Sequence, residues 1–199
     1  MVLLHDKISY LYSYEKLSAK EIAVRLKCAP STVDYWLNKL KVKKRSISEA
    51  SYLKHNPNGD PFSLRHLSKP KDYFIFGLGL GLYWGEGTKS NISSIRLGNT
   101  DPDLIQHFIL FLKKIYNIDQ RKLKFGLQIF SNMDSGKALK FWMSKLQVPK
   151  GSFQKVVVTP KRGVGTYTRK IEHGVLTVYF NNKKLRDILC GEIEKMRQV

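Results

Sequence analysis

The stretch "YFIFGLGLGLYWGEGTK", residues 73–89, constrains the fold of this chain more than any other segment. In a β-strand its alternating glycines would leave one strand face without side chains. In a helix, Gly77, Gly81 and Gly85 recur every four residues and share one face. Each glycine inside a helix costs roughly 1 kcal/mol relative to alanine, and close approach of another backbone offsets that cost. We therefore predict a helix packed closely along its glycine face.

Two nucleotide-binding motifs are excluded by the same stretch. A dinucleotide fingerprint beginning at Gly79 and Gly81 requires a glycine at position 84, where Trp84 stands. No Gly-Lys-Ser or Gly-Lys-Thr of a phosphate-binding loop follows. On another face of the predicted helix, we expect Phe74, Leu78 and Leu82 to pack into the core.

The charge of the chain indicates its class of partner. The formal net charge is +19 and the isoelectric point is about 9.9, which favours nucleic acid or an anionic membrane. The longest apolar run, from Tyr73 to Gly85, is about thirteen residues and too short to cross a bilayer core of about 30 Å. We therefore expect nucleic acid rather than a membrane.

The cysteines and the first residues favour a cytoplasmic, nucleoid-associated protein. Cys28 and Cys190 stand far apart and neither belongs to a CxxC pair, so we expect no disulfide framework and no zinc site. The opening "MVLLHDKISY" lacks the apolar core of a signal peptide.

Residues 1–46 predict a three-helix domain. Ser18 and Glu21 form a capping-box pattern at the start of one short helix, and Pro30 suits the first position of the next. A helix over about residues 4–14 would complete the core. Over about forty residues the pattern resembles the helix-turn-helix family of DNA-binding domains, although Ala29 replaces the usual polar cap before the second helix.

This resemblance implies that the second helix enters the major groove of DNA. The residues expected to reach bases or phosphates lie off its apolar stripe or directly follow it: Ser31, Thr32, Asp34, Tyr35, Lys39, Lys43, Lys44 and Arg45. The alternative is a plain helical bundle with a solvated basic face. Residues 47–70, rich in turn formers such as "KHNPNGDPF", are predicted to be a linker.

Residues 71–199 predict a mixed α+β domain, because strand, polar turn and helix patterns succeed one another three times. Within it, Gly81-Leu82-Tyr83-Trp84-Gly85-Glu86-Gly87 resembles the second part of the motif of LAGLIDADG homing endonucleases. The resemblance implies a curved, mostly antiparallel sheet that sits over double-stranded DNA. It also implies two such helices packed about a two-fold axis.

The same resemblance implies that Glu86 is a ligand of Mg²⁺ at the scissile phosphate. Asn99 and Lys183 match by position the polar residue and the lysine of the family's active site, with Lys89 as an alternative lysine. Only one motif is present, so two metal-bound phosphates imply a homodimer whose interface includes Gly77, Gly81 and Gly85.

A basic stretch supports DNA as the partner, because no acidic residue lies between Asp134 and Glu172. Its alternative is a solvated hairpin. The DNA-binding residues expected in this half of the chain are Arg96, Lys155, Lys161, Arg162, Arg169 and Lys170.

Two functions remain open at this point: a homodimeric, Mg²⁺-dependent, site-specific DNA endonuclease, and a DNA-binding transcriptional regulator built on a degenerate LAGLIDADG scaffold that does not cleave. A third interpretation, an RNA-binding or recombination accessory protein, fits the charge but explains the glycine helix less well.

Overall fold

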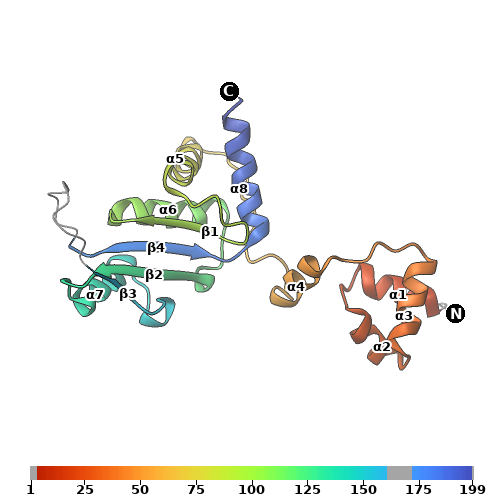
Figure 1. Cartoon of the computed structure of the whole chain (residues 1–199). Helices are drawn as coiled ribbons and strands as arrows, with labels where there is room; N and C mark the ends of the chain where they lie inside the picture. Colours follow the sequence, from red (N-terminus) through yellow and green to blue (C-terminus); the bar gives the residue numbers. More distant parts are fainter. Residues whose placement is uncertain (1–3, 161–171, 199) are drawn as a thin grey trace. The chain divides into compact units, whose positions relative to one another are not determined.

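The computed structural model describes residues 4–160 and 172–198 of the 199-residue chain. The chain divides into two compact units, Met1–Asp60 and Pro61–Val199. The boundary falls inside the segment 47–70. The described residues form eight α-helices and a four-stranded mixed sheet (Figure 1), so the predicted α+β class is confirmed.

The first unit contains three helices, α1 (Leu4–Ser13), α2 (Ala19–Leu26) and α3 (Pro30–Lys39), which enclose a small core. A fourth, α4 (Ile47–His55), lies within the segment predicted as a linker and has no buried residue. The buried core residues come from α1, α2 and α3: Ile8, Leu11, Tyr12, Ile22, Ala23, Val33 and Leu37.

The boundaries of α2 and α3 follow the local sequence. The Ser18 hydroxyl accepts a hydrogen bond from the Glu21 amide at 3.2 Å, and the Glu21 carboxylate accepts one from the Ser18 amide at 2.7 Å. The predicted capping box is therefore confirmed. Lys27 ends α2 in the left-handed conformation at φ 54°, and Pro30 opens α3, where its missing N–H costs nothing.

The second unit is built on a sheet of strand order β1-β4-β2-β3. The strands are β1 (Ile95–Asn99), β2 (Leu123–Phe130), β3 (Val157–Thr159) and β4 (Val175–Phe180). β4 pairs antiparallel with both β1 and β2, whereas β3 pairs parallel with β2. The sheet is thus mixed, with three of its strands antiparallel as predicted.

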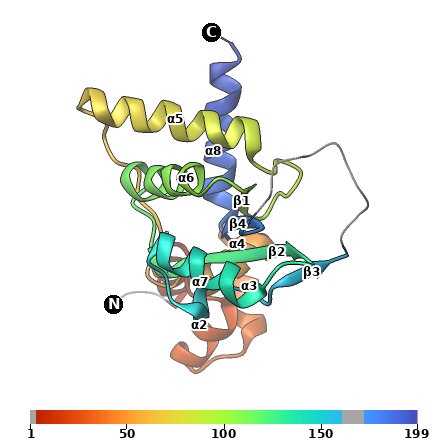
Figure 2. The same cartoon turned by 90° about the vertical axis from the view of Figure 1, so that its left-hand side faces the viewer.

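Four helices accompany this sheet: α5 (Pro70–Glu86), α6 (Pro102–Ile115), α7 (Ser135–Leu146) and α8 (Lys183–Met196). Figure 2 shows α6 and α7 on the same side of the sheet, with α5 lying beyond α6. Two 3-10 turns complete the unit, Gln120–Lys122 and Lys150–Ser152.

The sheet has one buried face and one open face, because burial alternates along its strands. In β2 every second residue from Leu123 is buried, and in β4 every second residue from Leu176 is buried. These side chains meet buried residues of α5, α6, α7 and α8 in one continuous core that includes Phe108 and Trp142. The residues between them form the open face of the sheet.

The glycine stretch is a helix, as predicted, but its inward face differs from the prediction. The buried residues of α5 are Ile75, Gly79, Leu80 and Tyr83. Gly79 permits this orientation, because a Cβ there would overlap the ring of Phe111 on α6.

The prediction that Phe74 and Leu78 pack into the core is therefore wrong for Phe74, which is 68% exposed, and Leu78 is only half-buried. Leu82 does pack against the core. The reason is that α5 contacts α6 through Gly79, which turns the side of the helix carrying Phe74 away from the sheet.

Candidate functional site

Glu86 is the last residue of α5 and presents an exposed carboxylate. Among the residues that the structure describes, it has neither a hydrogen-bond partner for its side chain nor an ion-pair partner. The backbone that follows it is held by hydrogen bonds from Gly87 and Thr88. The carboxylate is therefore the polar group at this position with free coordination capacity.

Backbone contacts hold the end of α5 against β1. Gly87 forms an antiparallel bridge with Leu97, and the Thr88 amide donates to the Arg96 carbonyl at 2.9 Å. The Gly87 amide donates to the Tyr83 carbonyl at 2.9 Å, which closes the last turn of the helix. Gly87 suits this position, because a Cβ there would overlap the Tyr83 ring and carbonyl.

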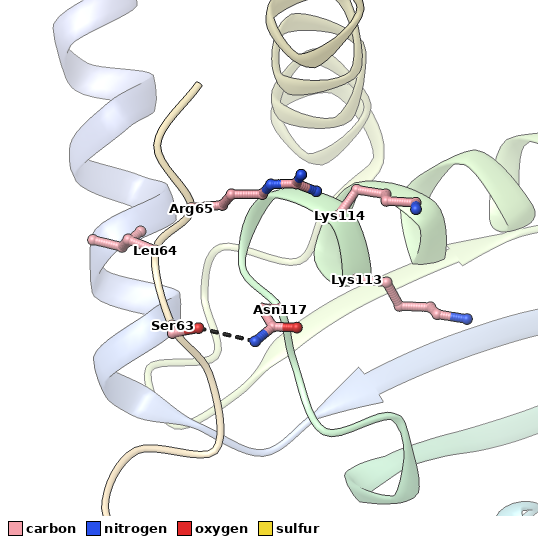
Figure 3. A pocket seen from close by; sticks show the side chains of 6 residues that line it. All are labelled: Ser63, Leu64, Arg65, Lys113, Lys114 and Asn117. Atoms are coloured by element: carbon pink, nitrogen blue, oxygen red, sulfur yellow. Dashed lines mark hydrogen bonds between the residues drawn. The ribbon is translucent and has the colours of Figure 1, made fainter. Parts of the chain in front are cut away.

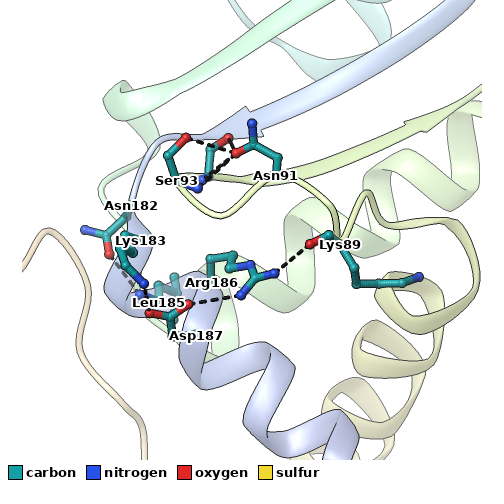
Figure 4. A network of polar contacts seen from close by, with 9 residues as sticks. Lys89, Asn91, Ser93, Asn182, Lys183, Leu185, Arg186 and Asp187 are labelled. Carbon is teal, nitrogen blue, oxygen red and sulfur yellow. Dashed lines mark hydrogen bonds and ion pairs between the residues drawn. The ribbon is translucent and has the colours of Figure 1, made fainter.

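Two cations, Lys89 and Arg186, fix the loop that follows Glu86, and Figure 4 shows the contacts of Arg186. The Lys89 ammonium donates to the Trp84 carbonyl at 2.5 Å and to the Tyr83 carbonyl at 3.4 Å, so it stabilises the negative end of the α5 dipole. The Arg186 guanidinium, on α8, donates to the Lys89 carbonyl at 2.6 Å and to the Asp187 carboxylate at 3.1 Å. Lys89, proposed as an alternative catalytic lysine, is thus engaged with the helix end.

Tyr83 lies beneath this loop and is fully buried. Burial raises the pKa of Tyr83 to about 12, so the phenol stays neutral at physiological pH. Neither its hydroxyl nor the Arg186 Nε has a hydrogen-bond partner among the described residues. The two groups belong to the support of the helix end rather than to its exposed surface.

The ion pairs of Asp187 should make the stability of the fold depend on pH. Burial alone would raise the pKa of Asp187, but hydrogen bonds from Lys183 and Arg186 outweigh it and lower the pKa below its usual value. A carboxylate whose pKa is lower in the folded state stabilises the fold above its unfolded-state pKa of about 3.9 and loses that contribution as the pH falls through the folded value.

We therefore expect Asp187→Asn to lower the melting temperature by a constant amount between about pH 5 and pH 7. The difference from the parent should shrink below about pH 4, where the parent's Asp187 becomes protonated. Thermal unfolding followed by circular dichroism at each pH measures the difference. A difference that does not shrink at low pH would contradict the assigned ion pairs.

The sheet register separates the other two predicted catalytic residues. Asn99 pairs with Leu176 at one end of the β1–β4 ladder, whereas Lys183 follows Phe180, which pairs with Ile95 at the other end. The antiparallel bridge at Gly87 directs Glu86 toward the Asn99 end and Lys89 toward α8. By this register Glu86 precedes the bridge on the Asn99 side of Leu97, and no hydrogen bond or ion pair joins it to Asn99 or Lys183 among the described residues.

The local contacts of these two residues are also defined. The Asn99 side chain accepts a hydrogen bond from the Asp101 amide at 2.9 Å, so it caps the turn before α6. Lys183 is exposed in the first turn of α8 and forms an ion pair with Asp187 at 2.5 Å.

The glycine face of α5, formed by Gly77, Gly81 and Gly85, is open. A Cβ added at any of the three would meet nothing within 4 Å. These glycines therefore do not serve packing within the chain, in contrast to Gly79. Large apolar side chains remain exposed on the same helix, among them Phe74 at 68% and Trp84 at 39%. Together, the three open glycines and the exposed apolar side chains form an apolar surface whose central part carries no side chains.

The open face of the sheet places Arg96, a predicted DNA-binding residue, beside polar and basic groups that were not predicted from the sequence. Arg96, Tyr179 and Lys124 lie side by side across β1, β4 and β2, and the Arg96 guanidinium sits 5.4 Å from the centre of the Tyr179 ring. Thr177 and Gln128 continue this face. The partial alternation of apolar and polar residues in "LKFGLQIF" was the signal that could have identified Lys124 and Gln128.

Two glycines shape that open face. A Cβ at Gly98 would lie 2.9 Å from the Thr177 hydroxyl, and a Cβ at Gly126 would lie 2.9 Å from the Tyr179 ring. Both contacts are closer than real Cβ atoms make. The glycines therefore leave room for the larger side chains of β4 to lie across the neighbouring strands.

On the first unit, the predicted contact residues of α3 are exposed or half-buried. Tyr35 and Lys39 form a cluster with Trp36, and the Lys39 ammonium lies 4.9 Å from the Trp36 ring centre. Asp34 forms an ion pair with Lys44 at 2.7 Å. Ser31, Thr32 and Lys43 are not involved in any of these contacts.

Arg45 has a structural role within the first unit. Its guanidinium donates to the Tyr12 carbonyl at 3.2 Å and to the Leu17 carbonyl at 2.5 Å, and it lies 4.0 Å from the centre of the Tyr12 ring. These contacts fasten the chain after α3 to α1. They argue against the predicted use of Arg45 as a phosphate contact.

The basic stretch after α7 is only partly described. Lys155 is exposed just before β3. Lys161, Arg162, Arg169 and Lys170 lie outside the described residues, so their predicted role stays a prediction.

Comparisons with family models, curated proteins and solved structures find no match for this chain. None of the helices in residues 4–160 and 172–198 combines the length and apolar character that a membrane crossing requires. The same residues hold no group of three or more His, Cys, Asp or Glu side chains that would bind a metal ion.

Proposed function

We propose that this chain is a sequence-specific DNA-binding protein that acts as a homodimer and cleaves DNA in the manner of LAGLIDADG endonucleases. The observation that carries the proposal is the end of α5. There, an open glycine face runs directly to Glu86, an exposed carboxylate with no partner among the described residues, while bonds to β1 and α8 hold the following loop.

The homodimer follows from what the open glycine face requires. Three glycines at which a Cβ would meet nothing within 4 Å each cost helix stability, and a second helix packed on them offsets that cost. A two-fold axis beside Gly81 would pair the two α5 helices and bring the two Glu86 carboxylates near each other. Exposed Phe74 and Trp84 would then be partly covered.

DNA contacts are assigned to two surfaces. The open face of the sheet offers Arg96 and Lys124 for phosphates and Gln128 for a base edge, and a β-ribbon fits the major groove. In the first unit, α3 would be the recognition helix of a helix-turn-helix domain, with Ser31, Thr32 and Tyr35 toward the bases.

The chemistry is hydrolysis of a phosphodiester. Mg²⁺ prefers carboxylate oxygens, and Glu86 would hold one ion together with oxygens of the scissile phosphate. When bound, such an ion would activate a water and neutralise charge that develops on the phosphate. Asn99, toward which the α5–β1 bridge directs Glu86, would orient the water, and Lys183 would have to act from the other end of the ladder.

The alternative is a DNA-binding regulator that uses the same surfaces without cleavage. Two observations favour it. The described residues of one chain hold no group of three or more acidic, His or Cys side chains that would bind a metal, and the register separates Lys183 from Asn99. A dimer that brings two Glu86 side chains together would supply further ligand oxygens. It would not bring Lys183 closer to Asn99.

A selection from a random duplex library tests DNA recognition, whether the chain is an endonuclease or a regulator. Duplexes that the purified chain retains are sequenced after several rounds. We expect enrichment of one near-palindromic site, because a two-fold dimer reads its half-sites in opposite orientations. Retention without sequence enrichment would reduce the proposal to non-specific binding of a basic protein.

We expect the double variant Arg96→Gln/Lys124→Gln to weaken binding to the selected site in a salt-dependent manner. Each lost phosphate contact should reduce the slope of log K against log salt by about 0.9. Filter binding at several salt concentrations measures the slope. Lys137→Gln/Lys140→Gln removes the same charge from α7 and should leave the slope unchanged. Equal slopes in both variants would show that the open face of the sheet does not contact DNA phosphates.

A further inference from the structure

A basic hollow lies away from Glu86, where the segment after the boundary between the two units crosses the end of α6. The hollow has a volume of about 470 Å³. Figure 3 shows the residues that line it: Ser63, Leu64, Arg65, Lys113, Lys114 and Asn117. Three of the six are cations from two different segments of the chain. No carboxylate lines the hollow.

The backbone holds the hollow in shape. The Ser63 amide donates to the Tyr116 carbonyl, and the Arg65 amide to the Ile115 carbonyl, each at 3.0 Å. The Asn117 side-chain amide donates to the Ser63 hydroxyl at 3.0 Å. These bonds use carbonyls at the end of α6 as acceptors, so the negative end of that helix is partly neutralised toward the hollow.

Some cations of this unit are neutralised by carboxylates, whereas those of the hollow are not paired in this way among the described residues. Arg121, Lys145 and Lys195 each form an ion pair with a carboxylate at 2.7–2.9 Å. In the part of the chain that the structure describes, neither Arg65 nor either lysine of the hollow has such a partner. All three cations are solvent-exposed and have no counter-charge among the described residues, so an anion held at the hollow would be attracted by each of them.

We propose that this hollow binds a phosphate group. Arg65 can offer two parallel N–H donors to phosphate oxygens, and Lys113 and Lys114 add point charges at the rim. The phosphate would belong to a polynucleotide backbone or to a small phosphate compound, since both present the same oxygens.

The test compares two triple variants of the full chain. Arg65→Gln/Lys113→Gln/Lys114→Gln removes the three cations of the hollow, whereas Lys137→Gln/Lys140→Gln/Lys150→Gln removes three exposed cations elsewhere in the same unit. Circular dichroism establishes that both variants fold. Inorganic pyrophosphate is titrated into each protein by calorimetry, and binding of a mixed-sequence DNA duplex is measured at several salt concentrations.

We expect pyrophosphate affinity to fall on the order of tenfold or more in the hollow variant and to stay at the parent value in the control. A reduced salt slope for DNA in the hollow variant alone identifies the ligand as a DNA phosphate. An unchanged slope beside lost pyrophosphate binding identifies a small phosphate compound. Equal behaviour of the two variants in both measurements would overturn the proposal.

This inference does not depend on the proposed function. If the parent binds pyrophosphate through the hollow but no DNA duplex, the proposed function fails and the hollow remains a phosphate site. If the parent binds DNA and both triple variants behave alike, the hollow is rejected and DNA binding stands.

Discussion

Replacing Glu86 by glutamine should reduce Mg²⁺-dependent DNA cleavage on the order of 10³-fold. A bound divalent ion supplies several kcal/mol of transition-state stabilisation, and each 1.36 kcal/mol is a factor of ten in rate. Glutamine keeps the size of the side chain but loses the charge that holds the ion. The carboxylate is exposed and has no partner among the described residues, so folding and DNA binding should be little affected.

The measurement is plasmid-library cleavage with Mg²⁺, beside filter binding to the same DNA. Glu172→Gln, which removes another exposed carboxylate of the same unit, is the matched control and should cut at the parent rate. If the parent and both variants bind DNA equally and none of them cuts, the endonuclease is excluded. The regulator then becomes the supported function, with α5 as its dimer interface.

The second large expected effect is on the free energy of unfolding, which should respond in opposite directions to alanine at two glycines of α5. Gly79→Ala should lower the free energy of unfolding by about 1–3 kcal/mol, because the added methyl group overlaps the Phe111 ring in the core. Gly81→Ala meets open space in the chain and should raise the stability of the monomer by up to about 1 kcal/mol through helix propensity.

Urea unfolding at low protein concentration measures both values for the monomer. The two substitutions are chemically identical and lie two residues apart on one helix, so each is the control for the other. Equal destabilisation by both would mean that the assigned orientation of α5 is wrong. A stabilising Gly79→Ala would mean that α6 does not pack as closely as the structure indicates.

The sequence predicted the features that depend on neighbouring residues. The capping box of Ser18 and Glu21 and the helix over the glycine stretch are both local patterns, and both are confirmed. The failure at Phe74 has a different origin. Which face of α5 turns inward is decided by the contact between Gly79 and Phe111, residues more than thirty positions apart, and periodicity alone does not identify it.

The prediction of the site was limited for the same reason, because strand pairing also depends on residues that are far apart in the sequence. Asn99 and Lys183 each follow a strand, but only the order β1-β4-β2-β3 shows that they stand at opposite ends of one ladder. The open sheet face, by contrast, was accessible from alternation in β2 and β4 once those segments were taken as strands. Its residues Lys124 and Gln128 could have been named from the sequence.

The pairing of two α5 helices along their glycine faces is tested most directly by a cross-link at Gly81. Gly81→Cys is made in a chain where Cys28 and Cys190 are replaced by serine, and the protein is oxidised mildly. A disulfide requires Cβ atoms about 4 Å apart, which a seam of paired glycine faces provides. Lys140→Cys in the same background is the control.

We expect a disulfide-linked dimer from Gly81→Cys, none from Lys140→Cys, and retained DNA binding by the linked dimer. A chain that sediments as a monomer with and without DNA, and in which Gly81→Cys cross-links no better than Lys140→Cys, would contradict the two-fold arrangement and with it the pairing of the two Glu86 side chains.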